Sequence, residues 1–292
     1  MKIPENRKLN FILLVCIAAN VLVGLRLYEA SIHRAGYYFL DVGQGDSELV
    51  ILPDNHGNEI KILIDGGRDK RVMRELGAVL GNDRRIDLVM MTHPQLDHFG
   101  GLIDVIQQYN IGAFITSGRR GEIAAFHELE DVLRVRQIKT IIVKEGDRMR
   151  YGKNTAEILS PSLKDAASKE LNDASLVLLI ASENVRALYT GDAGEKIEKR
   201  LLKTYNISAD ILKVGHHGSR FSSTASFLDA VNPKVAVIEV GKNTYGHPTI
   251  QTLKRLKATG AKIYRTDIDK AIRISTDDKK LMITKKQAYY YE

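Results

Sequence analysis

The segment Thr92–Gly101, THPQLDHFGG, concentrates metal-binding side chains in one turn of the chain. His93, Asp97 and His98 lie there, directly after an apolar stretch, Ile86–Met91, that is typical of a buried strand. Imidazole and carboxylate groups together are ligands for divalent cations, and loops that follow strands collect functional groups in α/β folds. The segment therefore predicts a metal site, although so short a pattern also occurs in proteins that bind no metal.

Three later segments repeat this arrangement. Asp192 ends the segment LYTGD, His216 and His217 lie in KVGHHGS, and His247 lies in GHP, each after an apolar stretch. Five of the eight histidines therefore follow predicted strands at three separate places, whereas core histidines would be scattered. The pattern favours one shared site. The other three histidines lie in polar surroundings and fit an ordinary surface role: His33, His56 and His127.

The elements that must position these residues begin with three short segments, Tyr37–Val42, Glu48–Leu52 and Glu59–Asp65, which predict an antiparallel meander. Helix and strand patterns then alternate, and a second half from about residue 156 repeats this logic. Two strand-rich halves with helices outside predict an α/β fold of two facing sheets, a four-layer αββα sandwich. No Pro- or Gly-rich linker divides residues 35–292, so we expect one domain there. Helices are expected at 69–80, 99–108, 122–136, 195–205, 222–231 and 249–259.

The N-terminal segment Phe11–Leu25 carries no charge and follows Lys2, Arg7 and Lys8. A membrane-spanning helix needs ~20 apolar residues and a cleaved signal ~7–15, so this segment lies between the two. Because no small-x-small cleavage site follows, we expect an uncleaved anchor within residues 1–30. With positive charge before the span, the domain is expected to face outward from the cell membrane. The alternatives are a cleaved signal and an ordinary buried helix.

Composition narrows the chemistry and the partners. Cys16 is the only cysteine, so residues 35–292 can form no internal disulfide and offer no thiolate to a metal. The formal net charge of +7 suits a polyanionic partner, either nucleic acid or an acidic envelope polymer. The alternative for any one basic cluster is an ordinary solvated surface.

Several motifs in one fixed order resemble those of the metallo-β-lactamase superfamily, and specifically the C-terminal hydrolase domain of ComEC competence proteins. The resemblance runs from about Tyr37 to Ser275, nearly the whole predicted domain. The motifs are FLDVGQGDS at 39–47, LIDGG at 63–67, THPQLDHFGG, NDASLVL at 172–178, LYTGD, KVGHHGS, KNTYGHP at 242–248 and YRTD at 264–267.

The resemblance implies a set of metal ligands. Asp97, His98 and His216 are expected to bind one cation. Asp192 is expected to bridge this cation to a second one, which His93 also holds. Which of the later histidines is the ligand stays open, because spacing does not distinguish among those at positions 216, 217 and 247.

The resemblance also implies roles around the cations. His217 and His247 are candidates for proton transfer or for gripping a phosphate oxygen, and they complete the expected catalytic set with the ligand Asp97. Asp65 is expected to orient the metal loop without binding the metal. The loop that carries Gln44 and Asp46 is expected to border the cations.

One position departs from the family pattern. The superfamily generally has His at position 95 and the competence branch has Asp, but Gln95 offers a neutral amide oxygen. No histidine lies between Ala156 and Ala181, where many relatives supply another ligand, and Asn172 and Asp173 are what remains. We therefore expect one tight and one weak divalent site. Nitrogen and oxygen ligands without sulfur suit Zn²⁺ or Mn²⁺, and the oxygen-rich weaker site favours Mn²⁺ or Mg²⁺.

These features predict a hydrolase that uses a metal-bound hydroxide. Since the competence branch is associated with degrading one DNA strand during uptake, the leading expectation is a phosphodiesterase or nuclease acting on DNA outside the membrane. One alternative is a phosphoesterase on cell-envelope polymers. The other is a non-catalytic module that binds DNA or a partner through a degenerate site, as Gln95 would suggest.

Overall fold

The computed structural model describes residues 13–23, 35–54, 56, 58–182, 185–277 and 280–285. The chain divides into two compact units, Met1–Arg34 and Ala35–Glu292. In the first unit a helix runs through residues 13–23, with exposed side chains. No helix within the described ranges is long and apolar enough to cross a membrane. Most of the predicted anchor, residues 1–30, lies outside the described residues, so the anchor stays a prediction.

The second unit is built from two sheets. In the described residues, the larger sheet has eight strands in the order β15-β14-β1-β2-β3-β4-β5-β6, and the smaller has seven in the order β13-β12-β11-β10-β9-β8-β7. The larger sheet comprises β1 (Gly36–Phe39), β2 (Glu48–Pro53), β3 (Glu59–Ile64), β4 (Arg85–Met91), β5 (Asn110–Thr116), β6 (Thr140–Ile142), β14 (Ile272–Asp277) and β15 (Lys280–Lys285). The smaller comprises β7 (Arg148–Tyr151), β8 (Asn154–Ser160), β9 (Val177–Ser182), β10 (Val185–Tyr189), β11 (Ile211–Lys213), β12 (Val235–Ile238) and β13 (Lys262–Arg265).

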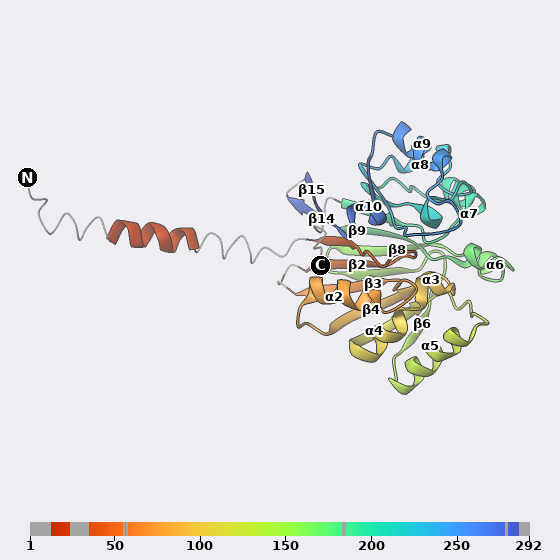
Figure 1. The fold of residues 1–292 in the computed structure, drawn as a ribbon, viewed down its shortest axis with the longest axis horizontal. Coiled ribbons are helices and arrows are strands. Elements are labelled where there is room, and N and C mark those ends of the chain that lie inside the picture. The colour runs from red at the N-terminus through yellow and green to blue at the C-terminus, as the bar shows by residue number, and fades with distance from the viewer. Residues whose placement is uncertain are drawn as a thin grey trace, which may run out of the picture. The chain divides into compact units, whose positions relative to one another are not determined.

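Helices cover the outer face of each sheet (Figure 1). The larger sheet carries α2 (Arg71–Leu80), α3 (Leu96–Phe99), α4 (Leu102–Gln108) and α5 (Ala124–Val135). The smaller carries α7 (Glu195–Thr204), α8 (Ala225–Val231) and α9 (Ile250–Ala258). Short helical turns are α6 (Leu163–Ala166), α10 (Thr266–Asp269), η1 (Leu171–Ala174) and η2 (Gly215–Gly218). The predicted αββα sandwich is confirmed.

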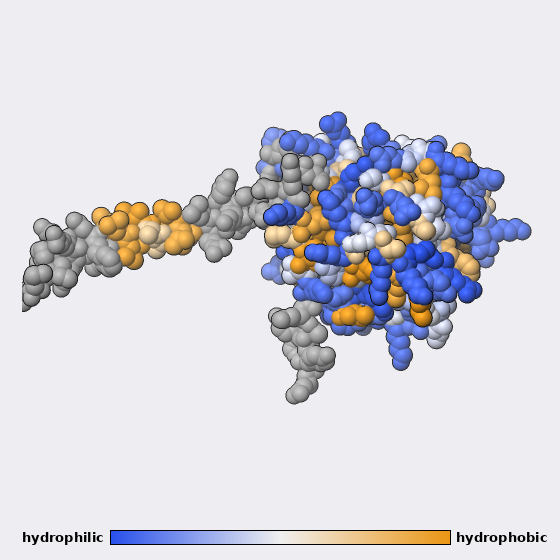
Figure 2. Space-filling view, turned by 90° about the horizontal axis from the view of Figure 1, so that it is seen from above, coloured by the Kyte–Doolittle hydropathy of each residue, from blue (hydrophilic) through white to orange (hydrophobic). Residues whose placement is uncertain are grey.

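Three apolar cores hold these four layers together. Along β2, Val50 and Leu52 enter the core between the sheets, whereas Leu49 and Ile51 enter the core beneath the helices of the larger sheet. Successive strand side chains point to opposite faces, so a strand covered on both sides needs a continuous apolar run. A third core lies between the smaller sheet and its helices. The face of the unit in Figure 2 is mostly hydrophilic with scattered apolar patches.

The structure corrects the predicted elements in two places. The helix expected at 99–108 begins later, because α4 starts at Leu102 and Phe99 instead ends the short helix α3. Gly100 and Gly101 lie between the two helices and pack closely: a Cβ at Gly100 would lie 2.1 Å from the Arg68 carbonyl oxygen. Strand β7 was not expected, since its sequence RMRY alternates over only four residues. The antiparallel pairing of β1, β2 and β3 agrees with the predicted meander.

Candidate metal centre

Residues from two distant strand ends meet in a buried cluster. His93 and His98 follow β4, Asp192 follows β10, and the side chains of all three are buried. His98 Nε2 lies 3.4 Å from Asp192 Oδ1, and His93 Nε2 lies 4.0 Å from Asp192 Oδ2. The ligand atoms of the three residues lie within 4.8 Å of one another, so a single cation can contact them all.

A third strand end contributes His217. Its Nε2 lies 3.4 Å from Asp97 Oδ2 and 3.8 Å from Asp192 Oδ2. Asp97, His98 and His217 form a second group whose ligand atoms lie within 4.8 Å of one another. Asp97 is partly exposed, which leaves this group an open side.

His216 lies further out than expected. Its Nε2 is 3.6 Å from Asp192 Oδ2, but its side chain is 31% exposed and it belongs to none of the ligand groups formed by the described residues. Both His216 and His217 have positive φ angles, 50° and 52°, in the turn η2, and this turn directs His217 inward. His247 stands behind His216, with ring centroids 5.6 Å apart. The geometry brings His217 into a ligand group and leaves the expected His216 at its edge, and which of the two binds a metal stays a prediction.

The buried polar atoms of the cluster lack partners of their own. Among the described residues, the Nε2 atoms of His93, His98 and His217 and Oδ1 of Asp192 are buried and form no hydrogen bond. Buried polar atoms are almost always satisfied, so a set of unpaired donors and acceptors aimed at one point requires an explanation. A divalent cation would satisfy nitrogen and carboxylate ligands together, so these residues fit one.

Comparison with known sequences identifies the family. The sequence model of the metallo-beta-lactamase superfamily matches residues 41–241. The chain belongs to this superfamily.

Curated relatives are competence proteins. ComE operon protein 3 of Bacillus subtilis is 29% identical over 273 residues, which cover 86% of this chain and 34% of that protein. Competence protein ComA of Neisseria gonorrhoeae is 31% identical over 239 residues, covering 80% of this chain and 31% of the relative. The chain thus spans about a third of the length of these relatives. The resemblance drawn from the motifs is confirmed.

Solved structures share the superfamily fold. The metal-dependent hydrolase Tm1679 of the beta-lactamase superfamily matches with a TM-score of 0.54 and 16% identity, covering 84% of this chain and 100% of that one. Zn²⁺-bound PqqB from Methylobacterium extorquens matches with a TM-score of 0.51 and 15% identity, covering 75% and 85% of the two chains. At such low identity these matches establish the fold alone.

Residues around the cluster orient two of its histidines, His98 and His217. Asp65 accepts hydrogen bonds from the Thr92 amide at 2.8 Å and the Thr92 hydroxyl at 2.6 Å, and it lies 2.8 Å from His98 Nδ1. Its carboxylate therefore points His98 Nε2 at the cluster, as expected for an acid that orients a metal ligand without binding the metal. His217 Nδ1 lies 2.9 Å from the Glu239 carbonyl oxygen, which turns its Nε2 inward in the same way.

A buried ion pair beneath the centre was not foreseen from the sequence. Lys213 Nζ donates to Asp46, and also to the Gly191 carbonyl oxygen at 3.0 Å. Both charged side chains are buried, and Asp46 Oδ1 lies 3.1 Å from His217 Nδ1. Lys213 ends the apolar strand β11, and a charged residue within so apolar a run is the one sequence signal that marks it.

Two buried glutamates extend this layer. Glu48 and Glu239 share one group with Asp46 whose ligand atoms lie within 4.8 Å of one another. Burial and the Glu239 carboxylate raise the pKa of Glu48 well above its usual value. Burial and the neighbouring Asp46 carboxylate raise the pKa of Glu239 to about 7. One proton shared by the two glutamates would relieve their repulsion.

Electrostatics divides the histidines into two kinds. Burial alone would lower the pKa values of His98 and His217, but the surrounding carboxylates, Asp192 first, outweigh it. They raise the pKa of His217 to about 10 and that of His98 well above its usual value. Burial lowers the pKa of His93 to about 3 and also lowers those of His216 and His247. The rings among the carboxylates therefore hold protons that an incoming cation would displace.

The expected weaker site around His93 stays a prediction, and the neighbouring residues that could complete it offer little charge. Gln95 is partly exposed and offers no charge. Asp173 is held by Lys196 at 2.5 Å and by the Ser168 hydroxyl at 2.6 Å, so its carboxylate is engaged elsewhere. Asn172 Oδ1 is buried without a hydrogen-bond partner, and Asn172 Nδ2 lies 3.5 Å from His216 Nδ1.

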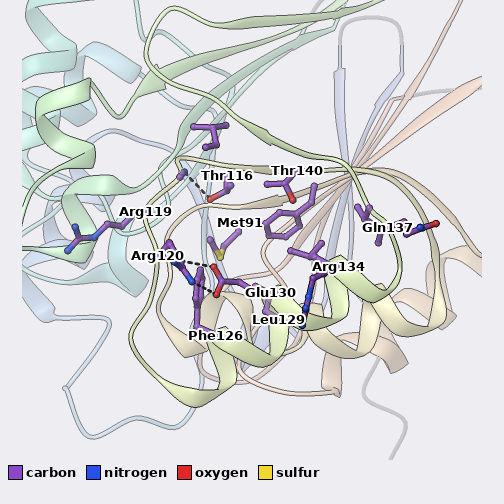
Figure 3. Close-up of a pocket in the computed structure, with 15 residues that line it drawn as sticks. Met91, Thr116, Arg119, Arg120, Phe126, Leu129, Glu130, Arg134, Gln137 and Thr140 are labelled. Carbon is purple, nitrogen blue, oxygen red and sulfur yellow. Dashed lines mark hydrogen bonds and ion pairs between the residues drawn. The ribbon is translucent and has the colours of Figure 1, made fainter.

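A separate cavity of about 560 Å³ lies between α5 and strands β5 and β6 (Figure 3). Its walls include Met91, Phe126 and Leu129. Arg120 Nε and Nη2 each donate a hydrogen bond of 2.7 Å to the Glu130 carboxylate there. It shares no residue with the candidate ligand groups of the described chain. Two of its walls contact the segment Thr92–Gly101: Met91 directly precedes that segment, and the Phe126 ring packs edge-on against Phe99 with centroids 5.5 Å apart.

Proposed function

We propose that this chain is a metal-dependent phosphodiesterase that cleaves DNA outside the cell membrane. The observation that carries the proposal is the convergence of unpaired histidine nitrogens and carboxylate oxygens from β4, β10 and β11 in one buried cluster. Membership of the superfamily and likeness to curated competence proteins support it. The net charge of +7 favours a polyanionic substrate.

Asp97, His98, Asp192 and His217 would hold the tighter cation, Zn²⁺ or Mn²⁺. His93, with Asp192 shared, would hold a weaker second one. A cation there supplies Lewis acidity and makes a water ionisable near neutral pH, with a pKa of about 7.

The histidines at the rim handle protons. His216 and His247 are partly exposed, and burial and neighbouring charges lower their pKa values, so both rings are neutral at pH 7. A neutral imidazole can accept a proton at one nitrogen and return it to a leaving oxygen. His247 thus keeps its expected proton-transfer role, and His216 takes the role first expected of His217.

Cleavage of DNA by the full chain tests the proposal. We expect Mn²⁺-dependent cleavage of single- or double-stranded DNA, and a rate at least about 100-fold lower for Asp97→Ala, since losing a residue outside the ligand set already costs 10–100-fold. Asp131→Ala, at an exposed carboxylate on α5, is the matched control and should keep the wild-type rate. Absent cleavage, or equal cleavage by Asp97→Ala, would refute the nuclease. Cleavage of a phosphodiester reporter with DNA left intact would point to an envelope polymer.

The anchor within residues 1–30 and the outward-facing domain belong to the same proposal. They rest on the charge pattern before the apolar segment Phe11–Leu25. Fractionation of cells that express the full chain tests them. We expect the protein in the membrane pellet, and complete recovery in the soluble fraction would rule the anchor out.

A further inference from the structure

Two Phe or Tyr side chains are exposed in the described part of the chain, and both lie on loops that follow or carry candidate ligands or proton-transfer histidines. Phe221 is 62% exposed and Tyr245 is 72% exposed, whereas the other described Phe and Tyr residues are buried or half-buried. Phe221 lies on the loop between η2 and α8, and Tyr245 lies on the loop between β12 and α9. Exposed aromatic rings at the same site suggest a ligand, because scattered apolar exposure would place them anywhere.

Hydrogen bonds join the Phe221 loop to the end of the Tyr245 loop and to helix α9, which directly follows it. The Thr249 amide donates to the Gly218 carbonyl oxygen at 3.0 Å, and the Thr252 hydroxyl donates to the Ser219 carbonyl oxygen at 2.8 Å. Arg255 Nη2 donates to the Ser222 carbonyl oxygen at 2.8 Å. The Phe221 loop is therefore fixed to the segment in which the Tyr245 loop ends, and these two loops are called the rim.

Contacts connect this rim to the cluster. The ring centroids of Tyr245 and His247 are 6.0 Å apart at 33°, and His247 is followed inward by His216, whose Nε2 lies 3.6 Å from Asp192. The Phe221 carbonyl oxygen accepts from the Glu195 amide at 2.9 Å, three residues beyond Asp192. Both aromatic residues thus border the loops that carry the candidate ligands.

Cations accompany the rings. The Arg220 guanidinium carbon lies 4.7 Å from the centroid of the Phe221 ring, and Lys242 is exposed on the loop of Tyr245. Within the described ranges, neither Arg220 nor Lys242 forms an ion pair. Exposed rings beside cations without ion pairs match single-stranded nucleic acid, whose bases stack on aromatic side chains and whose phosphates attract the cations. Bases in a duplex are already stacked on one another.

We propose that Phe221 and Tyr245 form a base-binding subsite, on which unpaired nucleobases of single-stranded nucleic acid stack at the mouth of the metal centre. The inference rests on the proposed function in that the bound strand is also the substrate. The subsite predicts that this site prefers single-stranded nucleic acid to a duplex and to a polymer without bases.

Binding by the full chain tests the subsite without relying on catalysis. In EDTA, fluorescence anisotropy compares a labelled single-stranded DNA with a strand of the same length that carries abasic sites. We expect wild type to prefer the strand with bases. Phe221→Leu and Tyr245→Leu should each lower affinity for that strand roughly 5- to 150-fold and barely affect the abasic strand. Phe221→Tyr and Tyr245→Phe should retain the preference, and Val135→Ala, an exposed apolar residue on α5, is the control.

Two results would overturn the inference: equal affinity of wild type for both strands, or leucine variants that weaken both strands alike. Since both rings are mostly exposed, the leucine variants create no cavity, and circular dichroism should show unchanged folding. A base preference without any metal-dependent cleavage would support the subsite and refute the phosphodiesterase. Cleavage without a base preference would do the reverse.

Discussion

Replacement of Lys213 by methionine tests the buried ion pair beneath the metal centre. Methionine has a similar length and apolar stem, so the change removes the ammonium group with little loss of packing. Asp46 then loses its closest cation, and the Gly191 carbonyl oxygen loses a donor at 3.0 Å. The Lys213 side chain is 0% exposed and the Asp46 side chain 1% exposed, so water cannot replace the missing partner.

The expected loss is large. Breaking a buried pair by removing one partner typically costs about 3–5 kcal/mol, because it leaves an uncompensated charge. For a chain of this size each kcal/mol lowers the melting temperature by about 2–4 °C, so Lys213→Met should melt roughly 6–20 °C lower. The matched control is Lys199→Met. Lys199 pairs with Glu195 at 2.7 Å on the surface, where both side chains are more than half exposed. That pair contributes less than about 0.5 kcal/mol.

Thermal unfolding followed by circular dichroism in EDTA measures both variants without a contribution from bound metal. A Lys213→Met melting temperature within about 2 °C of the Lys199→Met value would refute the argument. A difference of about 2 °C corresponds to no more than about 1 kcal/mol. It would mean that Asp46 finds another partner or that water enters the layer.

Three further results are expected. Gly45→Ala should lower the free energy of unfolding in urea by about 2–4 kcal/mol, because φ at Gly45 is +135° and the new Cβ would lie 2.2 Å from the Asp97 carbonyl oxygen. The control Gly246→Ala has open space around the new Cβ, so only its positive φ of +75° should cost stability, about 1 kcal/mol. His217→Gln should weaken Mn²⁺ binding in calorimetry at least about 100-fold and His216→Gln no more than about 10-fold, and the reverse order would restore His216 as the ligand. Mn²⁺ added to metal-free protein at pH 7.5 should release protons, because the carboxylates that outweigh burial raise the pKa of His217 to about 10 and a ligand imidazole must be neutral. Affinity should therefore rise with pH up to that value, and a pH-independent affinity would contradict this.

The convergence of the candidate ligands was predictable because they lie just past strand ends. His93, His98 and Asp192 each follow an apolar strand, and the carboxyl ends of strands in facing sheets meet at one edge. The assignment between His216 and His217 was not predictable. The two are adjacent in sequence, and which ring points inward depends on a turn with two positive φ angles.

The layer beneath the cluster shows a different limit. Glu48 lies in a strand whose other residues are apolar, and a lone acid there usually marks a solvent-facing position. In a sandwich the inner end of such a strand is buried, so Glu48 meets Glu239 and Lys213 from the opposite sheet. Pairing among charges so far apart in sequence follows from the packing of the two sheets, which local patterns do not contain.

Metal binding by wild type and Asp192→Asn tests the central claim most directly. Calorimetry and elemental analysis of the full chain should show a bound divalent cation in wild type. Asp192→Asn removes the carboxylate shared by both candidate sites, and should lower the affinity at least about 100-fold with an unchanged circular dichroism spectrum. A folded wild-type protein that binds no cation, or an Asp192→Asn variant that binds as tightly as wild type, would contradict the metal centre.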